Sequence, residues 1–133
     1  MNVAQIAGWS GAGKTTLIVA LIRLFTARGE RVGAIKHTHH ALNDEQIGDT
    51  AAFVEAGAAA AILAGDGEAL VRGERVRYAT PAELLPYLLS CDVVLVEGFK
   101  EFDGWPRIDV VRGEWRDAAE AAANLDRIWR SSR

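Results

Sequence analysis

Hydrophobic positions along this 133-residue chain gather in short apolar runs, separated by glycine-rich or polar segments. Five runs have the length and composition of β-strands: residues 3–7, 31–36, 58–64, 91–96 and 107–112. The fourth run is apolar at nearly every position, which is typical of a strand buried on both faces. The third is rich in alanine, which leaves its type open between strand and helix.

Helical patterns alternate with these runs. They cover about residues 14–28, a short stretch from Asp49 or Thr50 to Glu55, residues 80–89 and residues 116–129. The third helix has a clear start, because Thr80 can cap it, Pro81 suits its first turn and Glu83 completes a capping box.

A β-hairpin is predicted between the third and fourth apolar runs. Residues 69–72 and 75–78 have strand character and flank Gly73 and Glu74. A two-residue connection that begins with glycine predicts a type II′ turn.

The alternation of strands and helices predicts an α/β fold with helices on both faces of a mostly parallel sheet and a β-hairpin insertion. We expect residues 1–133 to form a single domain, because the chain shows no linker or internal repeat. Ligands of such sheets bind outside the carboxyl ends of the strands. Residues 8–15, 36–40 and 97–100 follow three of the predicted strands, so we expect the functional site there.

Residues 8–15 fit the phosphate-loop pattern G-x-x-x-x-G-K-[ST] between a predicted strand and a predicted helix. Backbone N–H groups of such a loop and of the helix start bind phosphate oxygens. Lys14 would reach the β- and γ-phosphates, and the Thr15 hydroxyl would ligate Mg²⁺. The candidate phosphate-binding residues are Gly8, Ser10, Gly11, Ala12, Gly13, Lys14, Thr15 and Thr16. The pattern favours the three-layer sandwich of P-loop NTPases over a glycine turn before an ordinary core helix.

Acidic residues supply candidate metal ligands beside Thr15. Glu97 ends the apolar run 91–96, where an acid of a phosphate-loop protein contacts Mg²⁺. The alternative is a solvated strand end, and the phosphate loop in the same chain favours the metal role. Asp49 is either a second Mg²⁺ contact or a first-turn acid of the short helix, and the pattern does not decide between them.

Basic residues and histidines follow the second and fourth strands. Lys36 precedes His37, His39 and His40, whose spacing differs from that of helical zinc sites and which have no cysteine nearby. We rank anion or partner contact first for this segment, a solvated loop second and a metal site third. Lys100 would contact phosphate or a partner, or be an ordinary surface lysine. We expect the ring of Trp9 to pack beside the phosphate loop.

The composition argues against several partners. A formal net charge of −3 without a run of four basic residues argues against nucleic-acid binding. A single cysteine, Cys91, excludes an intramolecular disulfide and a C-x-x-C pair. No apolar run is long enough for a membrane span and no secretory leader is visible, so we expect a cytoplasmic protein without membrane contact. The guanine-selecting [NT]-K-x-D segment is absent, so spacing alone does not identify the base.

Four segments together resemble the molybdopterin-guanine dinucleotide biosynthesis protein B (MobB) family: residues 8–16, 35–40, 48–50 with 55–58, and 94–100. The Ile-Lys-His-Thr-His-His and Val-Glu-Gly-Phe-Lys strings are more particular than the phosphate loop, and they occur in the family's order. The resemblance covers about residues 2–112.

This resemblance implies a homodimer that binds GTP and Mg²⁺ and hydrolyses GTP slowly at most. Its partner would be the molybdenum cofactor guanylyltransferase, which joins GMP to molybdopterin, and molybdopterin itself is a further candidate ligand. Carried over by position, the resemblance implies that phosphates and Mg²⁺ bind to Gly11, Gly13, Lys14, Thr15 and Thr16. It implies that Asp49 and Glu97 are the acids around the metal. The residues that line the site or meet the pterin partner would be Lys36, His37 and Lys100.

Two other functions compete with this one. A P-loop small-molecule kinase would have the same glycine loop, but the only arginine cluster for a lid is Arg72, Arg75 and Arg77, on the predicted hairpin. The other is an interaction module gated by a nucleotide without turnover.

Overall fold

The computed structural model describes residues 1–9, 11–39, 42, 50–114 and 116–132. Its elements are, in order, β1 (Asn2–Gly8), α1 (Lys14–Ala27), β2 (Val32–His37), α2 (Ala51–Glu55), β3 (Ala60–Ala64), β4 (Glu68–Val71), β5 (Glu74–Arg77), η2 (Pro81–Leu88), β6 (Val93–Glu97), β7 (Arg107–Val110) and α3 (Ala118–Ser131). Within these ranges, no helix is long and apolar enough to cross a membrane.

The strands form one sheet in the order β5-β4-β3-β2-β6-β1-β7. Strands β3, β2, β6, β1 and β7 run parallel, whereas β4 and β5 form an antiparallel hairpin at one edge. The predicted mostly parallel sheet with a hairpin insertion is therefore confirmed. The register pairs Glu97 of β6 with Ile6 of β1 on one side and with Lys36 of β2 on the other. These pairings gather the strand ends that carry the predicted site.

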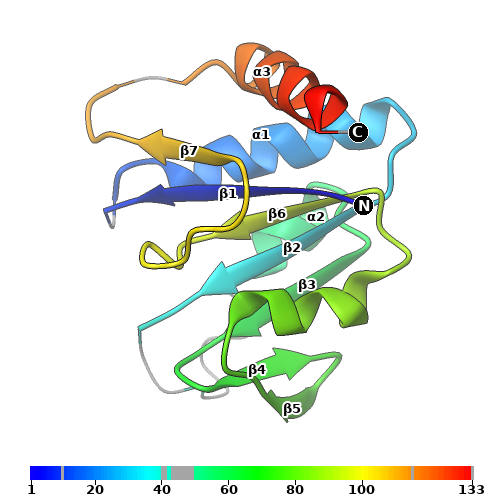
Figure 1. Cartoon of the computed structure of the whole chain (residues 1–133), viewed down its shortest axis with the longest axis vertical. Helices are drawn as coiled ribbons and strands as arrows, with labels where there is room; N and C mark the ends of the chain where they lie inside the picture. Colours follow the sequence, from blue (N-terminus) through cyan, green and yellow to red (C-terminus); the bar gives the residue numbers. More distant parts are fainter. Residues whose placement is uncertain (10, 40–41, 43–49, 115, 133) are drawn as a thin grey trace.

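Helices cover both faces of the sheet (Figure 1). One core cluster joins the strands to α1, α2 and α3, and its largest members include Phe25, Phe53 and Trp129. The other cluster joins the opposite face to η2 and the hairpin through Leu84, Leu88 and neighbouring side chains. Strand β6 contributes to both clusters and all five of its residues are buried, as its apolar run predicts. The three-layer arrangement is confirmed.

The helix predicted at residues 80–89 is a 3₁₀ helix rather than an α-helix. Its start is as predicted, because Thr80 and Glu83 form a capping box in which the Glu83 carboxylate accepts from the N–H groups of Ala79 and Thr80. Pro86 lies inside the helix and lacks the N–H that an α-helical turn needs there. The tighter 3₁₀ form suits such a short segment.

The hairpin turn differs from the prediction. Val71 pairs with Glu74, so the two connecting residues are Arg72 and Gly73 rather than Gly73 and Glu74. Both have positive φ, 51° and 81°. Positive φ at both central residues defines a type I′ turn, whose twist matches that of the flanking strands.

Boundaries of other elements shift by a few residues. The third strand begins at Ala60, the last ends at Val110, and α3 runs from Ala118 to Ser131. The side chain of Asp117, at the N-cap of α3, accepts a hydrogen bond from Ala119 N–H, which fixes this later start.

Candidate functional site

The ends of β1, β2 and β6 surround a cleft of about 650 Å³. It is lined by the predicted site residues Gly11, Gly13, Lys14, Thr15, Thr16, Lys36, His37, Glu97 and Lys100. Gly8 is the last residue of β1, and Ala12 within the loop is buried. Ser10 and Asp49 lie outside the described residues. The structure thus brings the three predicted segments into one place.

The glycine loop needs glycine at two positions for clear reasons. Gly13 stands at the N-cap of α1 with φ 100°, a conformation that other residues rarely adopt. A Cβ on Gly8 would lie 2.4 Å from the carbonyl oxygen of Val110 on β7. The first hydrogen bond of α1 runs from Leu17 N–H to the Gly13 carbonyl at 3.1 Å. The N–H groups of the preceding helical residues are therefore outside the helical ladder, at the end that attracts anions.

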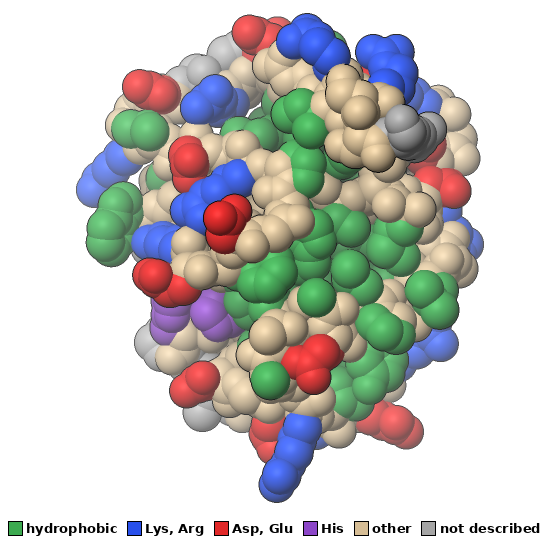
Figure 2. Space-filling view, viewed as in Figure 1, with side chains coloured by type: hydrophobic (Ala, Val, Ile, Leu, Met, Phe, Trp, Pro, Cys, Tyr) green, Lys and Arg blue, Asp and Glu red, His purple; other side chains and the backbone are tan. Residues whose placement is uncertain are grey.

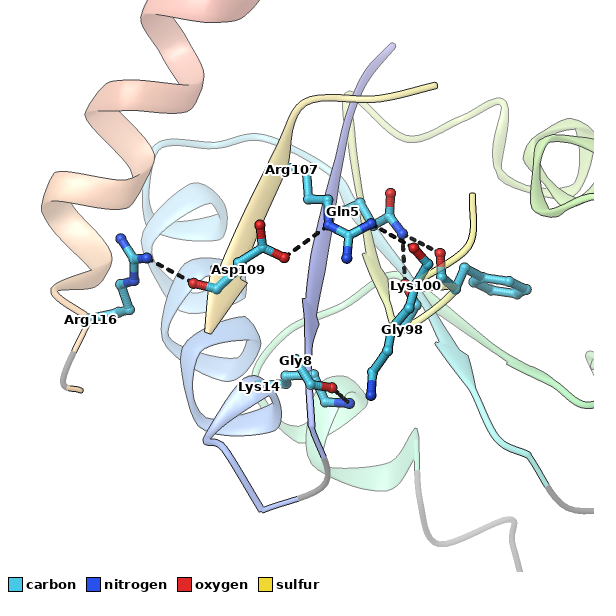
Figure 3. Close-up of polar contacts among 9 residues, drawn as sticks. Gln5, Gly8, Lys14, Gly98, Lys100, Arg107, Asp109 and Arg116 are labelled. Carbon is cyan, nitrogen blue, oxygen red and sulfur yellow. Dashed lines mark hydrogen bonds and ion pairs between the residues drawn. The ribbon is translucent and has the colours of Figure 1, made fainter. Parts of the chain in front are cut away.

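Lys14 lies across the mouth of this loop. Its Nζ donates to the Gly8 carbonyl at 2.9 Å (Figure 3). Burial lowers the pKa of Lys14, and the nearby Lys100 and Lys36 lower it further against the opposing effect of Glu97. Burial and the two neighbouring lysines thus disfavour the charged form of this amine. A bound polyphosphate would supply that charge and stabilise the protonated amine.

Glu97 is the acidic centre of the cleft and is only 4% exposed. Its Oε1 accepts from Thr15 Oγ1 at 2.9 Å, and its Oε2 lies 3.7 Å from Lys36 Nζ. That second oxygen is buried without a hydrogen-bond partner among the described residues. A buried carboxylate oxygen with free acceptor capacity beside a hydroxyl is a donor set suited to Mg²⁺, which prefers oxygen ligands and retains several waters.

The loop after β6 is fixed by side chains that the sequence patterns did not single out. Gly98 and Phe99 both have positive φ, 94° and 55°. The buried amide of Gln5 donates from Nε2 to their carbonyls at 2.8 and 2.6 Å. Arg107 Nη1 donates to the next carbonyl, that of Lys100, at 2.8 Å. Figure 3 shows Gln5 and Arg107 reaching this loop from β1 and β7.

His37 belongs to an aromatic group beside the cleft. Its ring stacks on Phe99 with centroids 4.1 Å apart, and His39 approaches it edge-on at 4.9 Å. Burial lowers the pKa of His37, with a smaller contribution from His39, which favours the neutral ring. Within the described ranges, no three His, Cys, Asp or Glu side chains are grouped to hold a metal, and His40 lies outside them.

Trp9 does not pack as expected. The residue is 79% exposed, and the Lys100 ammonium lies 3.7 Å from its ring centroid. The prediction that the ring packs beside the loop is therefore wrong. The ring instead forms a cation–π contact at the rim, and such contacts contribute about 0.5–1 kcal/mol at exposed sites.

Residues 3–129 match the family model of MobB, described as molybdopterin guanine dinucleotide synthesis protein B. The chain belongs to the MobB family.

Two curated MobB relatives are similar over most of this chain. The molybdopterin-guanine dinucleotide biosynthesis adapter protein of Escherichia coli is 42% identical over 104 residues, covering 71% of this chain and 57% of the relative. The protein of the same name from Haemophilus influenzae is 41% identical over 104 residues, covering 72% and 56%. This chain thus spans less than two thirds of the length of these MobB proteins.

Solved MobB structures share the fold. A MobB homologue from Bacillus stearothermophilus is 31% identical, with a TM-score of 0.51 over 95% of this chain and 71% of that one. Bacillus subtilis MobB has a TM-score of 0.53 at 23% identity, over 92% and 73%, and supports the fold alone.

Gln5 and Arg107 are the residues of this MobB site that sequence analysis missed. Gln5 is the single polar residue within the run 3–7, and this break in an apolar strand was the available signal. Arg107 gave no signal, because it opens a strand where a charged residue is ordinary. Both side chains donate hydrogen bonds to backbone carbonyls, and a sequence motif does not show such contacts.

Proposed function

We propose that this chain is a nucleotide-binding adapter that holds GTP with Mg²⁺ and serves the attachment of GMP to molybdopterin. The observation that carries the proposal is the buried Glu97 carboxylate, which accepts from Thr15 through one oxygen and has no hydrogen-bond partner on the other. It lies in one cleft with the glycine loop and Lys14. This is the arrangement that a triphosphate and its divalent cation require.

Each group of the cleft has a distinct task in this proposal. The loop N–H groups and the start of α1 bind the phosphates, and Lys14 exchanges its bond to the Gly8 carbonyl for phosphate oxygens. Thr15 and Glu97 hold the metal, and Asp49 is a further proposed ligand. When bound, Mg²⁺ would neutralise part of the negative charge of the phosphates. Lys36 and Lys100 add positive charge beside them.

Slow turnover at most is consistent with the lining of the cleft. Its cations, among the residues described, are lysines. Fast GTP hydrolysis normally needs an arginine that stabilises the transition state. The hairpin arginines of the kinase alternative are elsewhere: Arg75 pairs with Glu68 at 3.4 Å at the sheet edge. This placement favours an adapter over a kinase.

Guanine as the base and a guanylyltransferase as the partner rest on family membership and on the names of the relatives. We extend both to this chain, together with a homodimer in the cytoplasm.

Calorimetric titration of GTP and ATP in the presence of Mg²⁺ tests the nucleotide. GTP should bind more tightly than ATP, and ATP binding about tenfold more tightly would contradict the proposal. Thermal unfolding with millimolar GTP and Mg²⁺ is an independent check, because a bound ligand raises the melting temperature. Co-purification of a molybdenum cofactor guanylyltransferase with the tagged chain tests the partner separately.

A further inference from the structure

The sheet ends at β7, whose outer side pairs with none of the described strands. On its inner side, the N–H of Gln5 donates to the Pro106 carbonyl at 2.8 Å. Backbone groups of successive residues in a strand point to alternate sides in the plane of the sheet. The N–H and C=O groups of Arg107 and Asp109 therefore point away from β1, toward the open edge. Such outward-pointing groups can pair with another extended chain.

The open edge has few partners in the described part of the chain. The Asp109 carbonyl accepts from Arg116 Nη2 at 2.8 Å, and Figure 3 shows Arg116 reaching it from the side of α3. This contact agrees with the outward direction of that carbonyl. Within the described residues, the two N–H groups and the Arg107 carbonyl have no hydrogen bond. These three groups are available to an added strand.

A groove of about 430 Å³, which we call the edge groove, lies between β7 and α3. Arg107, Ile108 and Asp109 form its strand side, and its helix side includes the exposed residues Arg127 and Ile128. Figure 1 shows α3 beyond β7 at this end of the sheet. A chain in the edge groove would therefore pair with the strand on one side and pack against the helix on the other.

The edge groove has an excess of positive charge. Three arginines, Arg107, Arg116 and Arg127, line it together with one acid, Asp109, which pairs with Arg107 at 2.9 Å. Arg127 forms no salt bridge with a described residue. Figure 2 shows several Lys and Arg side chains, in blue, at the upper end of the molecule, where α3 lies in Figure 1. A segment that carries carboxylates beside Arg127 matches this charge.

The charge changes sign toward the start of α3. A neighbouring cleft of about 380 Å³ continues the edge groove there, since Ile108, Arg116 and Asn124 line both. Three carboxylates line this cleft, those of Glu114, Asp117 and Glu120. A matching segment therefore has acidic residues at one end and a basic residue at the other.

A second copy of this chain fits the open edge less well than a single strand does. Paired strands lie about 4.8 Å apart, whereas the axes of packed helices lie about 8–10 Å apart. If two β7 strands paired antiparallel about a two-fold axis, both α3 helices would lie on the same face of the joined sheet. Each helix extends beyond its own β7, so the two helices would occupy the same space. An extended segment of another protein brings no such helix.

We propose that the edge groove docks an extended segment of a partner protein, which adds a strand to β7 and places its carboxylates beside Arg127. This inference goes beyond the proposed function. Among the described residues, the edge groove and the nucleotide cleft share no lining side chain. The docking site therefore does not depend on a bound nucleotide.

Two fluorescein-labelled peptides test the edge groove, Asp-Val-Asp-Val-Thr-Val-Lys and the same sequence reversed. They present the same charges to the groove in the two possible strand directions. Each is titrated into the full chain, and binding is followed by fluorescence polarisation. Arg127→Glu should weaken the peptide that binds about fivefold, because a favourable charge pair becomes a repulsive one. Arg130→Glu, at an exposed position of α3 outside the groove, is the matched control and should leave binding unchanged.

Backbone pairing is tested separately from charge. A peptide that is N-methylated at alternate residues keeps its charges but loses the N–H donors of a strand, so it should not bind. Amide hydrogen exchange followed by NMR gives the same information from the protein side. The amides of Arg107 and Asp109 should become protected when the peptide binds. Those of Ile108 and Val110, which face β1, should be protected with or without it.

The expected result is saturable binding of one peptide, weakened by Arg127→Glu alone, with unchanged GTP affinity in both variants. Absence of saturable binding by either peptide would overturn the inference. Equal binding of the N-methylated peptide would show attraction of anions without strand pairing and would overturn it as well. So would a dimer in sedimentation velocity that Arg127→Glu dissociates, because it would assign the edge to a second copy. Peptide binding by a chain that fails to bind GTP would support this inference and refute the proposed function alone.

Discussion

Two loops meet at the phosphate end of the sheet, and they are held in different ways. In the loop after β6, the three successive carbonyls from Gly98 to Lys100 accept hydrogen bonds from buried or anchored side chains. The loop after β1 is held, in its described part, by the bond from Ala12 N–H to the Trp9 carbonyl and by the Lys14 bond to Gly8. The loop after β6 is thus fixed by the fold, whereas in the proposed function a bound phosphate would replace the Lys14 bond in the loop after β1.

This difference indicates that the two loops have different functions. The loop after β6 follows Glu97, the last residue of that strand, so its rigidity fixes the position of the proposed metal ligand. The loop after β1 keeps its polar groups available to phosphate. Substitutions in the loop after β6 should therefore reduce the stability of the fold, and those in the loop after β1 should reduce nucleotide binding.

The largest effect is expected for Gln5→Met. The substitution keeps the approximate volume but leaves the carbonyls of Gly98 and Phe99 without their donor, which should lower the free energy of unfolding by about 2–4 kcal/mol. Chemical denaturation measures this change. Asn124→Met, an exposed amide-to-thioether exchange on α3, is the control and should change stability by about 0.5 kcal/mol or less. Equal stabilities of the two variants would show that Gln5 does not fix the loop.

The next effect compares two glycines of positive φ. A Cβ at Gly98 would lie 2.9 Å from the His37 Cβ, whereas none of the described atoms lies within 4 Å of a Cβ at Gly11. Gly98→Ala should therefore cost about 3 kcal/mol from backbone strain and crowding together, and Gly11→Ala about 1 kcal/mol from strain alone. Denaturation curves of both variants without nucleotide test the order, and a reversed order would contradict the proposed rigidity of the loop after β6.

Lys14→Ala should affect binding rather than folding. Loss of a charged hydrogen-bond donor to phosphate is expected to cost about 2 kcal/mol of binding free energy. This corresponds to a dissociation constant for GTP that is roughly 30-fold higher. The melting temperature without nucleotide should stay close to that of wild type, because the lost bond to Gly8 lies at the mouth of the loop. A large decrease in that melting temperature with unchanged GTP affinity would show that Lys14 stabilises the fold and does not bind the nucleotide, which contradicts the role given to the loop after β1.

A smaller effect is expected from pH through His37. Burial lowers the pKa of His37 in the folded state, so the unfolded chain binds a proton more readily. The contribution to stability is therefore present above the unfolded pKa of about 6.5 and decreases as the pH falls below it. His37→Phe should flatten this part of the pH–stability curve, measured by chemical denaturation at several pH values. Identical slopes for wild type and His37→Phe would contradict this role.

Sequence patterns predicted the layers, the hairpin and the gathering of three strand ends, because these depend on local periodicity and on motif spacing. The contacts of Gln5 were not predictable, since its partners lie 93 and 94 positions away. The turn at Arg72 and Gly73 depends on strand register, and the 3₁₀ form of η2 accompanies Pro86. The contact of the Trp9 ring with Lys100 joins two loops that are far apart in the sequence. Pro86 lies within η2 itself, whereas the other features depend on contacts between separate segments of the fold.

The dissociation constant of GTP with Mg²⁺ and with EDTA, in wild type and in Glu97→Gln, tests the central claim most directly. If Thr15 and Glu97 hold the metal beside a loop-bound triphosphate, Mg²⁺ should tighten GTP binding by wild type and have much less effect on the variant. Glu97→Gln with EDTA should still bind GTP through the loop. Wild-type binding that is undetectable, or that Mg²⁺ leaves unchanged, would contradict the account.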